Sequence, residues 1–491
     1  MSTIAIIGSG IGGLVAGNLL AKKGHEVTIF ETHTTPGGYT AGFWRHGFYF
    51  ESGTLSFESS EMVFGAMKEL GLYEKIPFVR QHGRWIFGEL DCVSQSYTDF
   101  KSALLRTYPS DHEKLLRYFQ EVDRMVDAMR SMHKPNNLIE GVAFPFKIVK
   151  LISLFKKHAK TTVSEFTEKY FEKDTVLFRL LKDIGYPDMG ASILGGTFLS
   201  FLEDYWTIET GMQSWADILV ENFKSLGGEL KLNAKVDRIT TKNGTAVGVS
   251  SGGKDYAADY VISASDYKKT FLNLIDDDTL IPKTLKDNIE NASVSEGFFT
   301  VYLGVNLPHE KMKEYLKIPH VYYNDDAQEP DIYDSRDERY FEKAMVMLYS
   351  PSLRNAALAP EGKSSLMLQA MVPFRWMNNW NADDRESYKK LKEKAKTAMI
   401  ERTSTLITNL GDLIEYEDAA TPLTYERYTQ NTAGASSAWS WNPNKSFYKN
   451  IMGIHVKTPV KNLYIGSCWA CQIGGIPGAI GAAKACAKKI R

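Results

Sequence analysis

The sequence predicts an α/β protein whose central parallel sheet is built from both ends of the chain. Three observations predict this fold: a glycine-rich turn between a short apolar strand and a helix near residue 8, an acidic residue at the end of the following strand, and a second strand–glycine–helix unit near residue 466. With 491 residues, of which 43% are hydrophobic, the chain is too long for one ordinary domain. We therefore expect two intimately joined domains.

The first unit consists of a strand, a glycine-rich turn and a helix. The β-branched run TIAIIG (residues 3–8) is typical of a buried parallel strand, and a Gly-x-Gly-x-x-Gly motif follows it directly, before the helical stretch LVAGNLLAKKG. In this motif Gly8 permits a tight turn, Gly10 lets the backbone approach a pyrophosphate, and Gly13 lets helix and strand pack closely. The free N–H groups at the helix N-terminus favour phosphate binding. This context predicts a dinucleotide site.

Two features downstream of the helix indicate which dinucleotide binds. The strand HEVTIFE ends at Glu31, 18 residues after Gly13, where a carboxylate accepts hydrogen bonds from the adenosine ribose hydroxyls and repels a 2′-phosphate. Gly37 and Gly38 follow after five further residues, and this pair lets the backbone pass beside the pyrophosphate and flavin end of an extended FAD. The alternative interpretation of the pair is a simple turn after a strand.

The far end of the chain repeats the strand–glycine–helix pattern. LYIG reads as a strand that ends at Gly466, and IPGAIGAAKACAKKI reads as a helix with Gly475 and Pro477 in its first turn. The small residues of this helix let a flat group lie against it, and the positive end of its dipole would point at the pyrimidine edge of a flavin. A helix that only packs its small residues against neighbouring elements is the alternative.

Together these segments resemble the FAD-dependent amine-oxidase-like superfamily, and within it the phytoene desaturase, carotenoid isomerase and retinol saturase branch. Two further segments, GFYFESGTLSF (residues 47–57) and TPLTYERYTQNTAGASSAW (residues 421–439), extend the resemblance, which covers the whole chain in order. The resemblance implies an α/β fold with a Rossmann-like (GR2-type) FAD-binding domain, an interleaved α+β substrate domain and a helical membrane-facing insertion. We expect the FAD-binding domain in residues 1–60, 211–270 and 455–491, the helical insertion or lid in 61–210, and the substrate-binding domain in 271–454.

The resemblance also implies non-covalent FAD and a set of residues that hold it. That set is Gly8, Gly10, Ile11, Gly12, Gly13, Glu31, Gly37, Gly38, Tyr39, Thr54, Val236, Gly466, Ser467, Gly475, Ile476 and Pro477. Two positions depart from the family pattern: Tyr39 stands where a basic residue is frequent, and Ser467 stands where an acid often contacts the ribityl chain. No second glycine motif follows a strand elsewhere in the sequence, so we expect no dedicated NAD(P)H domain, and the electron donor or acceptor stays unassigned.

The middle of the chain carries further predicted elements. ADYVISASD (residues 258–266) is expected as a strand beneath the FAD, and EGFFTVYLGVN (residues 296–306) as an apolar strand with a bulge at Gly304. Residues 383–407 have the pattern of an amphipathic surface helix with a solvated charged face.

A basic amphipathic helix is predicted over residues 144–160. Its apolar stripe, surrounded by lysines, consists of Ile148, Leu151, Ile152 and Phe155. Such a helix lies in a bilayer interface or packs its stripe onto its own domain. Because the substrates of the resembled family dissolve in lipid, we expect a peripheral contact with a membrane surface, which lets a polyene pass from bilayer to flavin without crossing water.

The resemblance implies chemistry on the carbon–carbon bonds of long apolar lipids. We expect an FAD-dependent oxidoreductase or isomerase that desaturates, saturates or cis–trans isomerises a polyene or isoprenoid substrate. The rival hypotheses are an amine or small-molecule oxidase of the same superfamily and a non-catalytic flavin-bearing lipid-binding protein. No catalytic acid or base is assigned. Position alone gives the candidate pocket residues, for each of which core packing is an equal alternative: Ser56, Phe57, Tyr205, Trp206, Trp439, Trp441 and Cys471.

Composition and residue spacing bear on the possible partners, metal sites, disulfides and location of the protein. The formal net charge of −1 argues against a nucleic-acid partner, and the ten histidines show no pairs at metal-ligand spacing, so no metal site is expected. Four cysteines form no disulfide framework; Cys468 and Cys471 form a CxxC pair, for which redox shuttling, loop packing and half of a metal site are alternatives. The sequence contains no apolar run of transmembrane length and begins directly with a strand, so we expect a cytoplasmic protein.

Overall fold

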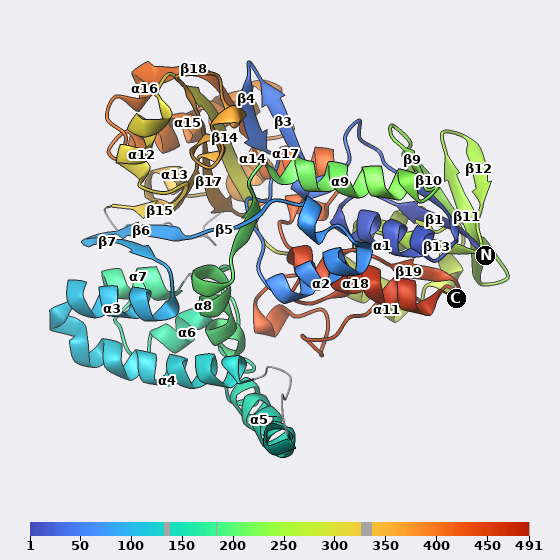
Figure 1. The fold of residues 1–491 in the computed structure, drawn as a ribbon, viewed down its shortest axis with the longest axis horizontal. Helices are drawn as coiled ribbons and strands as arrows, with labels where there is room; N and C mark the ends of the chain where they lie inside the picture. Colours follow the sequence, from blue (N-terminus) through green and yellow to red (C-terminus); the bar gives the residue numbers. More distant parts are fainter. Residues whose placement is uncertain (132–137, 183, 326–335, 491) are drawn as a thin grey trace.

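The centre of the computed structural model, which describes residues 1–131, 138–182, 184–325 and 336–490, is a five-stranded sheet (Figure 1). All neighbouring strands in it are parallel. In order across the sheet, the strands are β19 (Leu463–Ile465), β13 (Tyr260–Ser263), β1 (Thr3–Ile7), β2 (Glu26–Phe30) and β9 (Glu229–Lys231). The mixed α/β class is therefore confirmed, together with a parallel sheet that takes strands from both ends of the chain.

Three helices pack on this sheet: α1 (Ile11–Lys22), α9 (Met212–Ser225) and α18 (Gly475–Lys489). A further helix, α2 (Ser60–Leu70), packs on α1 and α18. α1 contacts α18 directly, and a Cβ on Gly12 would lie 2.2 Å from the carbonyl oxygen of Gly466. Only glycine permits so close an approach between α1 and the residue that follows β19. The N-terminal and C-terminal units thus lie side by side (Figure 1).

A second, seven-stranded sheet lies beside the first. In order, its strands are β18 (Ile414–Ala420), β14 (Gly297–Val305), β17 (Ser364–Val372), β16 (Val346–Tyr349), β15 (His320–Asn324), β6 (Gly83–Phe87) and β7 (Leu90–Ser94). The register between β14 and β18 shifts after Gly304, because Gly304 pairs with Tyr416 and Val305 with Ile414. The extra residue is therefore Glu415 on β18, and the bulge predicted at Gly304 itself is wrong. β6 pairs in parallel with β15, so the segment 61–210, predicted as helical, also gives two strands to this sheet.

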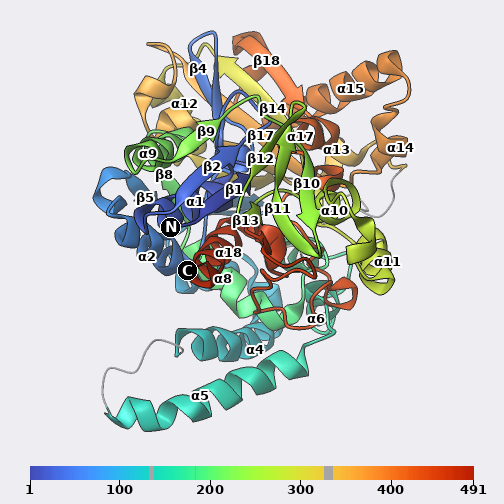
Figure 2. The same cartoon turned by 90° about the vertical axis from the view of Figure 1, so that its right-hand side faces the viewer.

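A layer of helices packs beneath β6 and β7 (Figure 1). Its helices are α3 (Tyr97–Thr107), α4 (His112–Arg130), α5 (Leu138–Lys157), α6 (Val163–Thr167), α7 (Val176–Lys182) and α8 (Leu194–Glu203). The rings of Trp85 on β6 and Tyr322 on β15 stack 4.0 Å apart in the apolar core that joins this layer to the sheet. α5 runs along the outer edge of the layer (Figure 2). Among the described residues, no helix combines the length and apolar character needed to cross a bilayer.

The remaining elements connect these layers. A hairpin of β3 (Gly42–Arg45) and β4 (Phe48–Glu51) and the pair β5 (Phe78–Arg80) and β8 (Trp206–Ile208) link the two sheets. An antiparallel sheet consists of β10 (Val236–Lys242), β11 (Thr245–Ser251) and β12 (Lys254–Ala257). The other helices are α10 (Tyr267–Lys269), α11 (Lys283–Asn291), α12 (His309–Leu316), α13 (Tyr340–Lys343), α14 (Trp376–Trp380), α15 (Arg385–Thr403), α16 (Leu410–Leu413) and α17 (Pro422–Thr429). α15 confirms the helix predicted over residues 383–407.

Candidate functional site

The glycine turn after β1 leaves the N-terminus of α1 open. Gly8 has a φ of +95°, and a Cβ on Gly13 would lie 2.0 Å from the Gly8 carbonyl oxygen, so both positions require glycine. A Cβ on Gly10 would meet no described atom within 4 Å. α1 begins at Ile11, no side chain caps it, and its first turn contains no acidic residue. Its free N–H groups are therefore available to an anionic ligand such as a pyrophosphate.

Glu31 follows β2, and its carboxylate is held against the glycine turn. Its Oε2 accepts hydrogen bonds from the Ser9 backbone nitrogen at 2.8 Å and from Ser9 Oγ at 2.7 Å, while its Oε1 accepts one from the His33 nitrogen at 2.8 Å. A carboxylate offers about four acceptor positions, so one remains for a ribose hydroxyl. The Ala234 nitrogen donates to the Glu31 carbonyl oxygen at 2.8 Å, which brings the buried Val236 to the same edge of the site.

The second glycine pair lies directly on the first turn. Gly37 and Gly38 have φ values of +120° and +59°, and the Gly37 nitrogen donates to the Ser9 carbonyl oxygen at 3.0 Å. A Cβ on Gly38 would lie 3.3 Å from the Cα of Gly10. Because glycine combines a positive φ with so close an approach, the structure brings the two glycine motifs into one wall of the site.

Tyr39, which stands where the resembled family often has a basic residue, joins this wall to the second domain. Its hydroxyl lies 3.1 Å from the carbonyl oxygens of both Gly434 and Ala435 and donates to them. Its own carbonyl oxygen accepts a hydrogen bond from the Thr54 nitrogen at 2.8 Å. Burial raises the pKa of the Tyr39 phenol well above its usual range. Tyr39 therefore acts as a neutral link between segments and supplies no positive charge to a phosphate.

α18 presents a second free helix N-terminus. It begins at Gly475, whose φ is +72°, no side chain caps it, and its first turn contains Ile476 and Pro477 but no acidic residue. A Cβ on the preceding Gly474 would lie 2.3 Å from the Ser437 carbonyl oxygen. The glycines therefore allow segment 421–439 to lie against the start of this helix.

Ser467, which was predicted to contact a ribityl chain, is hydrogen-bonded to the segment that follows β13. Its Oγ donates to the Ser265 carbonyl oxygen at 2.8 Å. The single hydroxyl proton is thereby used, and the oxygen can only accept a hydrogen bond from a ligand hydroxyl.

These features fit FAD. α1 follows β1 and α18 follows β19, and both strands belong to one parallel sheet, so both helix N-termini lie at its carboxyl edge. One free N-terminus suits the pyrophosphate, Glu31 suits the ribose, and the other N-terminus suits the electron-rich edge of a flavin ring.

A partly buried carboxylate that the sequence analysis missed lies at the start of α18. Glu58 Oε1 is 3.5 Å from the position that a Cβ would take on Gly475. Burial, together with the charge of Asp204, raises the pKa of Glu58 to about 7. Burial also raises the pKa of the nearby Tyr186 to about 12, and the charge of Glu58 adds to that shift. A lone glutamate in GTLSFESS gives no sequence signal of this placement, because nothing near it in the chain reveals its burial.

Ser56, one of the predicted pocket residues, belongs to a buried polar network. Gln81 Nε2 donates to Ser56 Oγ and lies 2.6 Å from His320 Nδ1, while Arg354 Nη2 donates to Gln81 Oε1 at 2.9 Å. The ring of Tyr205, also predicted in the pocket, lies 5.9 Å from the His320 ring. Burial and the charge of Arg354 lower the pKa of His320 to about 3. The network fixes Ser56 between the two domains.

Three aromatic residues predicted in the pocket have structural contacts instead. Phe57 and Trp439 are 1% and 0% exposed and lie in the hydrophobic core. Trp439 stacks on Phe447 at 4.0 Å and donates its Nε1 to the Trp469 carbonyl oxygen. Trp206 donates its Nε1 to Asp204 at 2.9 Å. The alternative of core packing therefore holds for Phe57 and Trp439, because neighbouring aromatic rings enclose both.

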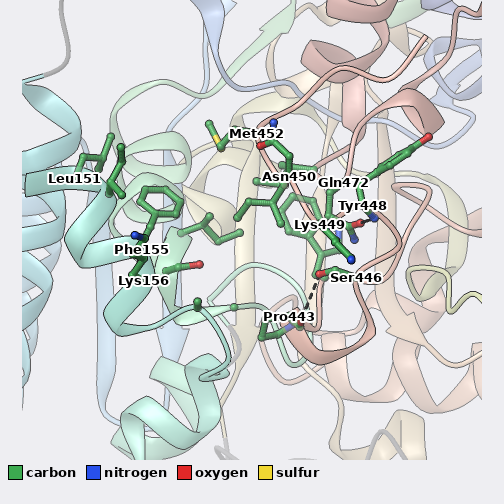
Figure 3. Close-up of a pocket in the computed structure, with 18 of the residues that line it drawn as sticks. Leu151, Phe155, Lys156, Pro443, Ser446, Tyr448, Lys449, Asn450, Met452 and Gln472 are labelled. Carbon is green, nitrogen blue, oxygen red and sulfur yellow. Dashed lines mark hydrogen bonds between the residues drawn. The ribbon is translucent and has the colours of Figure 1, made fainter. Parts of the chain in front are cut away.

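A mostly apolar cavity of about 880 Å³ opens between α5 and the loop before β19. Figure 3 shows Leu151 and Phe155 of α5 facing the loop residues Tyr448, Asn450 and Met452 across it. The volume is within the usual range of sites for small molecules. Three residues of the apolar stripe predicted on this helix, Leu151, Ile152 and Phe155, thus line the cavity, and Ile148 does not.

The inner part of this cavity approaches the start of α18. Gln472 and Ile473, which line it, directly precede the glycines at the start of that helix. Trp441 also lines the cavity, and its ring stacks on Tyr186 at 4.6 Å. The cavity therefore extends from α5 to the segment directly before α18, and Trp441 on its wall stacks on Tyr186.

The CxxC pair lies beside this region as two free thiols. Burial raises the pKa of Cys468 to about 12 and that of Cys471 to about 11, and Cys471 Sγ donates weakly to the Gly478 carbonyl oxygen. Thiols with such pKa values form few thiolates at neutral pH, which disfavours the redox interpretation. The described residues contain no cluster of metal-ligating side chains.

Two open helix N-termini on one parallel sheet, joined to a second sheet beside an apolar cavity, define a two-domain protein of the flavoprotein class. The chain belongs to the family of flavin containing amine oxidoreductases, and the model of that family matches residues 11–491. That family implies FAD as cofactor and an FAD-dependent oxidoreductase as enzyme class.

Three relatives of this chain are named as an isomerase, a desaturase and a reductase. The chain is 25% identical to a prolycopene isomerase of Daucus carota (87% of this chain, 70% of the relative) and 23% identical to a 4,4'-diapophytoene desaturase of Staphylococcus haemolyticus (98% and 97%). It is 24% identical to an all-trans-retinol 13,14-reductase of Danio rerio (99% and 85%). Among solved structures, putrescine oxidase bound to putrescine shares the fold with a TM-score of 0.66 at 14% identity, over 100% of this chain and 98% of that one.

Proposed function

We propose that this protein is an FAD-dependent oxidoreductase that acts on the C–C and C=C bonds of a long apolar polyene or isoprenoid lipid. The observation that carries the proposal is the apolar cavity between α5 and the loop before β19, whose lining includes Gln472 and Ile473, shortly before α18 begins. The named activities of the relatives, an isomerase, a desaturase and a reductase, share substrates of this chemical class and support it.

The proposed cofactor site consists of residues from three separate segments. Gly10 and the α1 N-terminus would hold the pyrophosphate, Glu31 the adenosine ribose, and the α18 N-terminus the flavin ring. When bound, FAD supplies a two-electron acceptor or donor for carbon–carbon chemistry. We propose non-covalent binding, because the nearby thiols of Cys468 and Cys471 are poor nucleophiles at their raised pKa.

The cavity walls give the protein two tasks in such a reaction. The apolar side chains of Leu151, Phe155 and Ile473 would exclude water and hold the chain of the substrate by burial of its methylene groups, each contributing about 0.8 kcal/mol. The stacked rings of Trp441 and Tyr186 would set the orientation of the polyene where the cavity approaches α18. Desaturation, saturation and isomerisation, the three reactions that the sequence leaves open, would all use this arrangement.

We further propose that the outer face of α5 docks on a membrane surface. Phe146 and Val149 are 74% and 65% exposed, and Met452 on the facing loop is 65% exposed. Lys150 and Lys156 on the same helix are exposed and would face anionic headgroups, whereas Lys157 pairs with Glu121 at 2.9 Å. A docked mouth would let a lipid enter the cavity without crossing water.

The proposed function is tested by anaerobic mixing of the FAD-loaded protein with candidate substrates. Prolycopene, a phytoene and all-trans-retinol form one arm, and putrescine forms the other. We expect loss of the oxidised flavin absorbance, or an isomerised product, with a polyene only. Reduction by putrescine alone would favour an amine oxidase, and no reaction with either, together with a copurifying lipid, would favour a flavin-bearing lipid-binding protein.

A further inference from the structure

Glu58 lies beside the start of α18, where we propose that the flavin ring binds. Its Oε1 is 3.5 Å from the would-be Cβ of Gly475, and Ile473, two positions before that glycine, lines the cavity. Because Gly475 carries no side chain, the space between Glu58 and the α18 N-terminus stays free for a ligand. Among the described residues, the hydrogen bond that the Glu58 carboxylate accepts comes from its own backbone nitrogen.

The groups that face Glu58 are acids and phenols. Asp204 and Tyr205 are the two residues directly before β8, and Tyr186 comes from the segment between α7 and α8. Burial raises the pKa of both phenols, which therefore stay neutral near pH 7. Cys468, which adds to the pKa shift of Tyr186, is also neutral because burial raises its own pKa. Glu58, with a pKa of about 7, is thus the member of this group that gains and loses a proton at neutral pH.

We propose that Glu58 exchanges a proton with a substrate carbon held over the flavin ring, a role that rests on the proposed function. In the desaturating direction, one C–H bond breaks, its proton forms an O–H bond with Glu58, and its electron pair becomes the new C=C π bond. FAD, when bound, would supply the two-electron oxidant that takes the hydride from the neighbouring carbon. In saturation, protonated Glu58 would return the proton, and reduced FAD would supply the hydride.

The first experiment needs no substrate. The midpoint potential of the FAD-loaded protein is measured between about pH 5 and about pH 9, on both sides of the Glu58 pKa. Because a carboxylate beside the ring gains a proton when the ring gains electrons, we expect the slope of potential against pH to change near pH 7. The reduced flavin ring also loses a proton near neutral pH, so in Glu58→Gln we expect only the slope change that this ring proton causes. A Glu58→Gln profile that coincides with the wild-type profile overturns the proposal.

Glu296 provides a matched control. Burial raises its pKa to about 7 as well, but the charged groups beside it are Lys445 and Asp188. We expect Glu296→Gln to keep the slope change of the wild-type protein. If Glu296→Gln removes the change and Glu58→Gln keeps it, the proton is held at Glu296 and the proposal fails.

The second experiment measures flavin reduction by whichever polyene is active in the substrate test. We expect Glu58→Gln to lower the anaerobic reduction rate about 100-fold, with the Kd for FAD unchanged, and Glu58→Asp to recover part of the rate. An unchanged rate in Glu58→Gln overturns the proposal. Loss of FAD binding in that variant also overturns it, since Glu58 would then hold the cofactor. If no polyene reduces the wild-type flavin, the proposed function fails, whereas the potential measurement still decides whether Glu58 exchanges a proton.

Discussion

Gln81 Nε2 lies 2.6 Å from His320 Nδ1, and this contact fixes the protonation of a histidine that is 1% exposed. Arg354 donates to Gln81 Oε1, so the amide nitrogen of Gln81 faces the imidazole and can only donate. His320 Nδ1 therefore accepts, and the ring proton resides on Nε2, which has no hydrogen-bond partner among the described residues. The histidine is held neutral next to a guanidinium.

This arrangement predicts a pH-dependent stability. The pKa of His320 is about 3 in the folded protein against an ordinary value of 6.5, so the unfolded chain binds more protons between these values, and stability falls as the pH drops through that window. Between pH 7 and pH 5 we expect wild-type protein to lose about 2 kcal/mol more unfolding free energy than His320→Gln. Glu51 and Glu296, whose pKa values are raised to about 8 and about 7, act in the opposite sense, but both proteins contain them. Urea titrations at the two pH values measure the difference, and parallel pH profiles would contradict it.

The contact between Gly12 and Gly466 predicts a stringent requirement for glycine. In Gly12→Ala the new methyl group would lie 2.2 Å from a backbone oxygen that cannot rotate away, so α1 must move off the end of β19. We expect a loss of about 1–3 kcal/mol in unfolding free energy and weaker FAD binding. The control is Gly65→Ala in α2, where a Cβ meets no described atom within 4 Å; a gain of up to about 1 kcal/mol is expected there. Equal effects of the two substitutions would show that packing at Gly12 is not the cause.

Removal of the Glu31 carboxylate is expected to weaken FAD binding. Glu31→Ala loses the proposed ribose contact and frees the Ser9 nitrogen, which donates to Glu31 at 2.8 Å. Because a hydrogen bond to a charged group contributes about 1.5–3 kcal/mol, we expect the Kd for FAD to rise at least about tenfold. Titration of the apoprotein followed by flavin fluorescence measures the change. Glu26→Ala, an exposed position on the same strand, should leave the Kd unaltered, and a normal Kd in Glu31→Ala would refute the assignment.

The exposed apolar residues of α5 predict membrane binding. The double substitution Phe146→Glu and Val149→Glu puts two negative charges on a face that would enter the headgroup region, and we expect flotation with phosphatidylglycerol-containing vesicles to fall at least about tenfold. Trp44→Glu is the control, because Trp44 is 51% exposed on β3, at the opposite end of the molecule (Figure 1). Flavin content should remain normal in all three proteins. Equal flotation of the wild-type and the doubly substituted protein would show that α5 is not the docking surface.

The sequence by itself determined the cofactor half of this protein. A tight turn, a close approach to a phosphate and a helix start each need particular residues at fixed spacing. Gly8, Gly13 and Gly475 can therefore be identified from the amino-acid sequence alone. The bulge predicted at Gly304 was misplaced, because glycine at that position makes room for the Phe48 ring, 2.5 Å from its would-be Cβ, and the extra residue lies on β18.

Only the tertiary structure decided which side chains surround the reaction space. Phe57 and Trp439 became core residues, and Leu151, Ile152 and Phe155 of α5 came to line a cavity, because burial depends on partners that the fold brings together from other segments of the chain. Glu58 gained its raised pKa in the same way: a carboxylate has no unusual proton affinity until the folded chain removes water from around it. Local conformation is encoded in neighbouring residues, whereas desolvation is a property of the packed molecule as a whole.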